Sequence, residues 1–132
     1  MISGAHVATD LAGPASDEEG RSFARDVLGF TWRTDHAVET GQVLSLNGFL
    51  GELQEIEFNT APTAWIYRVE SPDALEPAED AETLMRYADN NMSAVVGRKG
   101  RGGSLVMGFP FETIGDARVR DFVMQIILSF LK

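Results

Sequence analysis

The segment Ser104–Ile114, with the sequence SLVMGFPFETI, constrains the fold more than any other part of this chain. Ser104–Met107 is a short apolar run typical of a buried strand. Gly108 and Pro110 end that run, and a helical pattern follows almost at once. This order predicts a strand, a sharp loop and a helix, with Glu112 just beyond the carboxyl end of the strand. Ligands and catalytic groups collect at such strand ends in α/β sheets, so a functional site is expected here.

The C-terminal segment is the clearest helix in the sequence. Its apolar residues recur at spacings of three and one, which places them on one helical face. They are Val119, Phe122, Val123, Ile126, Ile127, Phe130 and Leu131. Asp116 can cap the amino end. We therefore predict a helix over residues 116–131, with Phe122 and Ile126 in the middle of its buried face.

A second helix is predicted near the N-terminus. Met1–Val7 is typical of the end of a strand, and Thr9–Ala15 of a loop. Ser16 and Glu19 match a capping box. Four apolar residues then share one face before a glycine ends the pattern; they are Phe23, Ala24, Val27 and Leu28. These signals predict a helix over residues 17–28.

The middle of the chain has the pattern of β-structure. Strands are expected at residues 31–38, 42–46, 54–58, 64–69, 93–97 and 105–109, with a hairpin turn at 39–41 and a glycine-rich turn at 98–103. Residues 71–80 contain two prolines and four acidic residues, which favours a surface loop. Residues 82–88 fit either a short helix or a strand.

Charge and composition exclude several classes of protein. The 132 residues are enough for one domain with a single core. The net charge of −9 argues against binding to nucleic acid or to an anionic membrane surface. The chain has no cysteine, which excludes disulfides, thiolate metal sites and a cysteine nucleophile. Its two histidines and scattered carboxylates match neither a zinc nor a calcium pattern, so no metal or cofactor is predicted.

Two sets of residues are candidates for catalysis. Glu112 could act as a general acid or base at its strand end; the alternative is that it caps the next helix or pairs with a nearby arginine. Ser3, His6 and Asp10 suggest acyl transfer, although the glycine-flanked serine elbow is missing. The alternative for His6 is a hydrogen bond that fixes a loop.

Three further features have a functional and a structural interpretation. His36 lies in the strand expected at 31–38, where a lone histidine is usually structural. The basic loop at residues 97–103 could cradle a phosphate, but it precedes a strand rather than a helix, which favours a hairpin turn. Trp32, Trp65 and Tyr67 could stack on sugar rings if exposed, although aromatic residues in strands are usually part of a core.

Three segments resemble a known family. Residues 2–10 (ISGAHVATD), 23–34 (FARDVLGFTWRT) and 89–131, which includes GFPFETI, resemble the carboxyl-terminal half of the class I glutamine-amidotransferase-like, flavodoxin-like domain. The form they are most similar to occurs in multidomain bacterial proteins described as xanthan lyases or amidases.

The resemblance has consequences for activity. In active glutamine amidotransferases, the corresponding strand end carries a His-Pro-Glu triplet, and a cysteine elbow lies earlier in the domain. Here the segment Phe109–Glu112 keeps the proline and the glutamate, without the histidine, and the chain has no cysteine. The resemblance therefore implies a relative without glutaminase activity, and a chain that is the carboxyl-terminal part of a larger flavodoxin-like domain.

These observations combine into one expectation. The fold is α/β, a single domain over residues 1–132 with a flavodoxin-like mixed sheet, an antiparallel extension from Thr31 to Val69, and helices at 17–28 and 116–131. The function is that of a non-catalytic domain in a bacterial carbohydrate- or cell-wall-associated protein. The alternatives are an amidase- or esterase-type hydrolase that uses Glu112 with Ser3 or His6, and an oligomerisation module. The expected partners are a second copy, the upstream part of a parent protein, or a glycan. The compartment is cytoplasmic for the chain as written, or extracellular if it is part of a larger secreted protein.

Overall fold

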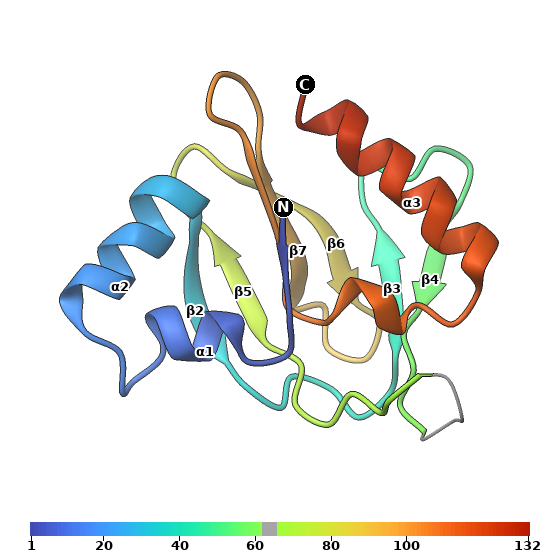
Figure 1. Ribbon diagram of the computed structural model, residues 1–132, viewed down its shortest axis with the longest axis horizontal. Coiled ribbons are helices and arrows are strands. Elements are labelled where there is room, and N and C mark those ends of the chain that lie inside the picture. The colour runs from blue at the N-terminus through green and yellow to red at the C-terminus, as the bar shows by residue number, and fades with distance from the viewer. Residues whose placement is uncertain (62–65) are drawn as a thin grey trace.

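The computed structural model describes residues 1–61 and 66–132, which form a curled mixed sheet of eight strands with helices packed against it (Figure 1). The strands are β1 (Ile2–Ser3), β2 (Phe30–Thr34), β3 (Gln42–Ser45), β4 (Glu55–Glu57), β5 (Ala74–Pro77), β6 (Glu82–Tyr87), β7 (Ser93–Arg98) and β8 (Ser104–Met107). The helices are α1 (Val7–Ala12), α2 (Glu18–Phe23), its continuation as a π-helix, η1 (Ala24–Leu28), the 3-10 turn η2 (Phe111–Thr113) and α3 (Ala117–Phe130). None of the helices in the described residues is long and apolar enough to cross a membrane. The expected α/β class is confirmed.

The sheet runs in the order β1-β8-β7-β6-β3-β4, and β2 and β5 form a branch that joins β7. β1 and β8 pair in parallel, whereas the other strand pairs are antiparallel. Register shifts interrupt the β6–β7 and β2–β5 pairs. Such irregularities increase the local twist, which is consistent with the curl of the sheet.

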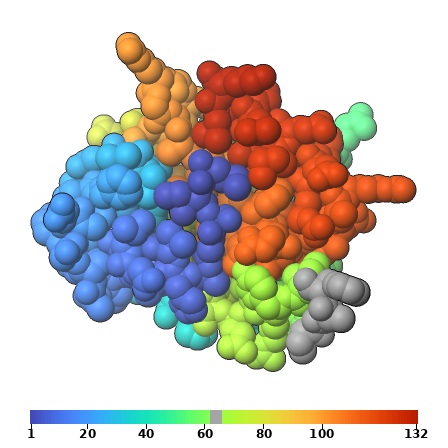
Figure 2. Space-filling view, in the orientation of Figure 1, coloured from blue at the N-terminus to red at the C-terminus, as the bar shows by residue number. Residues whose placement is uncertain are grey.

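The two central strands are buried on both faces. In β7, Val95 belongs to one hydrophobic cluster and Val96 to another; in β8, Leu105 and Val106 divide in the same way. This division follows from the strand geometry, because successive side chains point to opposite faces. The first cluster includes the buried residues of α3, and the second includes those of α1 and η1. In Figure 2 the N-terminal segment, in dark blue, lies between the side formed by α1 and α2 and the side formed by α3.

The predicted C-terminal helix is confirmed, with a correction to its buried face. Asp116 caps α3, since its side chain accepts from the amides of Arg118 and Val119. Val123 and Ile127 are buried, but Phe122 is 42% exposed. α3 also approaches the sheet closely, because a Cβ atom on Gly97 would lie 2.7 Å from the ring of Phe130. The centre of the buried face is therefore shifted by one residue from the expected position.

The N-terminal predictions need three corrections. The cap of α2 is Asp17, which accepts from the amide of Gly20, whereas the Ser16 hydroxyl donates to Gly13. The helix predicted over 17–28 ends as a π-helix, so Phe23 and Val27 turn toward solvent while Ala24 and Leu28 are buried. Residues 7–12 form helix α1, where the end of a strand was expected up to Val7 and a loop over residues 9–15.

Several predictions in the middle of the chain were also wrong. Residues 39–41 do not join a hairpin, because β2 pairs with β5 while β3 pairs with β4 and β6. Residues 74–77, expected in a surface loop, form strand β5. Residues 82–87 form a strand, and the hairpin of β7 and β8 is confirmed. Of the strand expected at 64–69, residues 66–69 form no regular strand and 64–65 lie outside the described residues.

The packing of α3 predicts the effect of truncating its buried face. Ile127 is 1% exposed, so we expect Ile127→Ala to lower the free energy of unfolding by about 2–5 kcal/mol, through lost burial and the cavity left behind. Gln125 on the exposed face is the matched control, and Gln125→Ala should change stability by less than about 0.5 kcal/mol. Urea titration measures both values, and equal losses would contradict the assigned face.

Candidate functional site

The predicted site lies where β1 and β8 end side by side. Ser3 and Met107 are partners in the parallel pair, and the Gly4 amide donates to the Met107 carbonyl at 3.3 Å. The next residue, Gly108, accepts from the amide of Asp73 at 2.7 Å. A Cβ atom on Gly108 would lie 2.0 Å from the Asp73 carbonyl oxygen, so only glycine fits at this crossing. The close contact brings the start of β5 against the end of β8.

The carboxylate of Asp73 is the centre of this region. Its Oδ1 atom accepts from the Thr9 hydroxyl at 2.6 Å, and Oδ2 accepts from the amide of Ala8 at 2.9 Å and that of Thr9 at 3.4 Å. Trp32 Nε1 donates to the Thr9 hydroxyl at 2.9 Å. Asp73 is fully buried, and it satisfies the free amides at the start of α1. A residue 65 positions away therefore serves as the cap of this helix.

Burial raises the pKa of the Asp73 carboxyl, and the hydrogen bonds from Thr9 and Ala8, together with the charge of His6, offset part of that rise. Tyr87 donates its hydroxyl hydrogen to the Asp73 carbonyl at 2.6 Å. Burial, and to a lesser extent the charge of Asp73, raises the pKa of Tyr87 well above its usual value. The Tyr87 hydroxyl therefore stays protonated and remains a donor.

The structure separates the residues that the sequence suggested as a catalytic set. Ser3 Oγ accepts a hydrogen bond from the amide of Phe111 at 3.2 Å, and this bond links β1 to the segment that follows β8. His6 is the exposed N-cap residue just before α1, and Asp10 is exposed within that helix. In the described part of the chain, no side-chain hydrogen bond joins Ser3, His6, Asp10 or Glu112 to one another. A serine hydroxyl needs an adjacent base to become a nucleophile, and this arrangement lacks one among the described residues.

Glu112 follows Phe111, whose amide binds Ser3 Oγ, so the two residues lie on linked segments. The Glu112 carboxylate, however, has a different partner. It is exposed in η2, and Oε1 accepts from the hydroxyl of Tyr67 at 2.8 Å. Partial burial, then the bond to Glu112, raises the pKa of Tyr67 to about 12. Tyr67 therefore donates to Glu112 throughout the neutral range. Among the residues that the structure describes, Glu112 neither caps the next helix nor pairs with an arginine; it binds the Tyr67 hydroxyl instead.

The remaining candidates from the sequence have structural roles where they are described. His36 is outside a strand, in an exposed loop with φ of 47°, and lies 3.4 Å from the Asp35 carboxylate. Arg98, in the basic loop, donates to the carbonyl oxygens that end η1 and to Asp80. Trp32 is half-buried beside Thr9, whereas Trp65 lies outside the described residues. The hairpin interpretation of the basic loop is confirmed.

Asp73 was not among the residues that the sequence patterns singled out. It lies in the acidic stretch interpreted as a surface loop, and its partners are 64 and 65 positions away in a segment also interpreted as a loop. The Ser-Pro-Asp order at 71–73 shows only that the chain changes direction.

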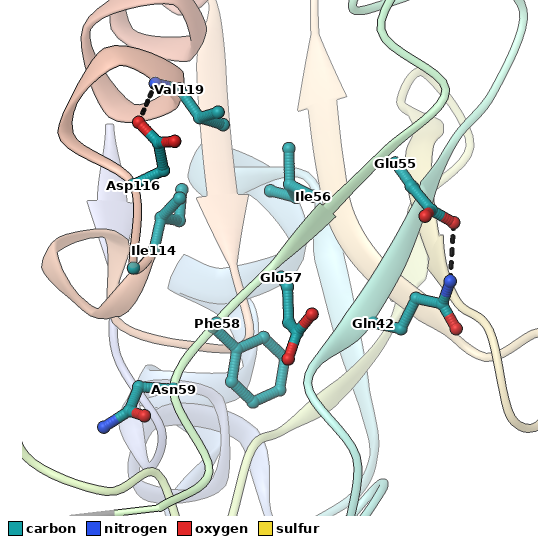
Figure 3. A pocket seen from close by; sticks show the side chains of 10 residues that line it. Gln42, Glu55, Ile56, Glu57, Phe58, Asn59, Ile114, Asp116 and Val119 are labelled. Atoms are coloured by element: carbon teal, nitrogen blue, oxygen red, sulfur yellow. Dashed lines mark hydrogen bonds between the residues drawn. The ribbon is translucent and has the colours of Figure 1, made fainter. Parts of the chain in front are cut away.

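A hollow lies at the opposite edge of the sheet from this site (Figure 3). It is a cleft of about 370 Å³ between β4 and the start of α3. Ile56 and Phe58 lie on one side, and Ile114 and Val119 on the other. The polar residues along it are mostly acidic, since Glu55, Glu57 and Asp116 also line it. Among the described residues, no group of three or more His, Asp or Glu is arranged to bind a metal ion.

Comparison with known proteins gives information on the fold. No protein-family model matches the sequence, and no curated protein matches it. Among solved structures, the chain is similar to a β-galactosidase from Bacillus circulans sp. alkalophilus, with a TM-score of 0.56 and 18% sequence identity. The match covers 80% of this chain and 14% of the β-galactosidase chain. At this identity the likeness shows a shared α/β fold.

The buried Asp73 predicts a pH dependence that can be measured. Its folded pKa is raised above the unfolded value of about 3.9, so its contribution to stability is fully present below that value and is lost as the pH rises through the folded pKa. The Asp73→Asn variant does not titrate there. We therefore expect the stability of wild type minus that of the variant to be larger near pH ~4 than near pH ~7.

Urea unfolding at the two pH values measures this difference. Asp10→Asn is the matched control, because Asp10 is an exposed carboxylate on the helix that Asp73 caps. A difference for Asp73→Asn that is constant or larger near neutral pH would contradict the assignment.

Proposed function

We propose that this chain is a non-catalytic glutamine-amidotransferase-like domain of a larger bacterial protein associated with carbohydrate or the cell wall. The observation that carries the proposal is the use of the candidate catalytic groups as structural links. Ser3 Oγ binds a backbone amide, Glu112 binds Tyr67, and Asp73 caps α1. The chain also has no cysteine to take the role of the amidotransferase nucleophile.

The link to carbohydrate is supported by the shared fold of a segment of a β-galactosidase. That segment is a small part of a much longer chain, as expected for a domain that accompanies a catalytic unit. A glycan, or another part of the parent protein, is the partner that this proposal favours.

We also propose that the sheet has a flavodoxin-like arrangement. Two features support a flavodoxin-like arrangement: the parallel pairing of β1 with β8, and the burial of β7 and β8 between α3 on one side and α1 with η1 on the other. Within the extension expected from Thr31 to Val69, β3 and β4 form an antiparallel pair, whereas β2 pairs with β5, which lies outside that range.

Two alternatives have observations in their favour. A hydrolase is supported by the closeness of Ser3 to the segment that carries Glu112, through the bond from the Phe111 amide. An oligomerisation module is supported by exposed apolar residues on α3, where Phe122 is 42% and Leu128 is 55% exposed. The non-catalytic proposal accounts for more of the contacts at the predicted site.

Hydrolysis assays separate these functions. We expect no turnover of glutamine, simple esters or muropeptide amides above background, because a lone carboxylate supplies only about 10²–10⁴-fold by general acid–base catalysis. Glu112→Gln keeps the shape of the side chain, and Glu52→Gln is the control at another exposed glutamate. Turnover that is lost in Glu112→Gln, with unchanged stability and with Glu52→Gln active, would overturn the non-catalytic proposal.

A further inference from the structure

Among the described residues, the cleft beside β4 contains a strand edge with no neighbouring strand along most of its length. β4 is the last strand in the order of the sheet and pairs only with β3 among the described strands. The Phe58 amide donates to the Gly41 carbonyl at 2.9 Å, and the Ser45 amide donates to the Gln54 carbonyl at 2.8 Å. Backbone groups alternate in direction along an antiparallel strand, so those of Glu55 and Glu57 point away from β3.

One end of this edge is already closed. Phe58 forms an isolated antiparallel bridge with Ile114, and the Gly115 amide donates to the Glu57 carbonyl at 3.4 Å. The amide and carbonyl of Glu55 and the amide of Glu57 remain directed outward, along the cleft. A strand edge with such groups is a template for pairing with another extended chain.

The side chains along the edge divide between two environments. Ile56 is buried on the face that α3 covers, and Ile114 and Val119 line the other wall of the cleft. Glu55 and Glu57 are exposed on the opposite face. A second, shallow groove continues over α3, and Val119 lines both hollows. An added strand would therefore place one set of alternate side chains beside carboxylates and the other set against apolar atoms.

We propose that the free edge of β4 binds an extended segment of another polypeptide, in which basic residues alternate with apolar ones. The segment adds a strand to the sheet, with its backbone paired to Glu55 and Glu57, its basic side chains beside these two carboxylates, and its apolar side chains in the cleft under α3. This inference is independent of the proposed function, because a hydrolase or a non-catalytic domain could use the same edge.

Charge decides between this partner and a second copy of the chain. Pairing β4 with β4 of a second copy would bring glutamates of one strand against those of the other, and like charges across strands are destabilising. The two chains would also each carry a net charge of −9. A basic segment reverses both effects and is attracted by the same carboxylates.

The binding experiment uses the full chain and a labelled hexapeptide in which lysine and valine alternate, with fluorescence anisotropy as the readout. We expect it to bind, and the peptide with glutamate in place of lysine to bind at least about tenfold more weakly. Two further peptides carry N-methyl groups on one or the other set of alternate amides. Methylation on the edge that faces β4 should abolish binding, whereas methylation on the other edge should leave it unchanged.

Matched variants locate the site. The double variant Glu55→Gln with Glu57→Gln keeps the backbone edge and removes both charges, so the lysine peptide should bind about tenfold more weakly. The control, Glu39→Gln with Glu79→Gln, removes the same charge from exposed positions outside the cleft and should bind as the wild type does.

Three results would overturn the proposal. Equal affinity in both double variants would place the peptide elsewhere. Equal binding of the two N-methylated peptides would exclude strand addition. Absence of peptide binding, together with self-association that strengthens in Glu55→Gln with Glu57→Gln, would assign the edge to a second copy of the chain.

Discussion

The buried carboxylate of Asp73 is the interaction on which the arrangement of this domain depends. It is fully buried, and its oxygens are satisfied by two amides and a hydroxyl at the start of α1. Its backbone amide and carbonyl bind Gly108 and Tyr87, so one residue links α1, β5, β6 and the end of β8. A buried carboxylate is costly unless it is fully hydrogen-bonded, which makes these contacts interdependent. α1 has six residues and would be marginal alone, so its position comes from this cap and from Ala8 in the second core.

The same contacts explain why few side chains at the strand ends are available for catalysis. The position where an α/β protein often places its catalytic groups is filled here by links between segments: Ser3 to Phe111, Asp73 to Thr9, and Glu112 to Tyr67. The opposite edge of the sheet, by contrast, has outward backbone groups on β4 and two exposed carboxylates, those of Glu55 and Glu57. This arrangement is consistent with the non-catalytic function that we propose.

The sequence predicted those elements whose structure is decided by neighbours in the chain. The repeat of apolar residues located α3 and its cap at Asp116, and the strand pattern located the β7–β8 hairpin. The predictions failed where contacts between distant segments of the chain decide the structure. β5 resembles a loop in sequence because it ends in Glu76 and Pro77, which are exposed, while Ala74 and Leu75 are buried by the rest of the sheet. At the candidate site, Ser3 and Glu112 were found, but Asp73 and Thr9 were missed because their link spans 64 positions.

A double-mutant cycle between Asp73 and Thr9 tests most directly whether this link organises the domain. The free energies of unfolding of Asp73→Asn, Thr9→Val and the double variant, compared with wild type, give the coupling energy between the two side chains. We expect a favourable coupling of about 1 kcal/mol or more, since the contact is charge-assisted and partly buried. A coupling near zero, with two independent losses, would contradict the claim that the Asp73 carboxylate fixes α1 to the end of the sheet.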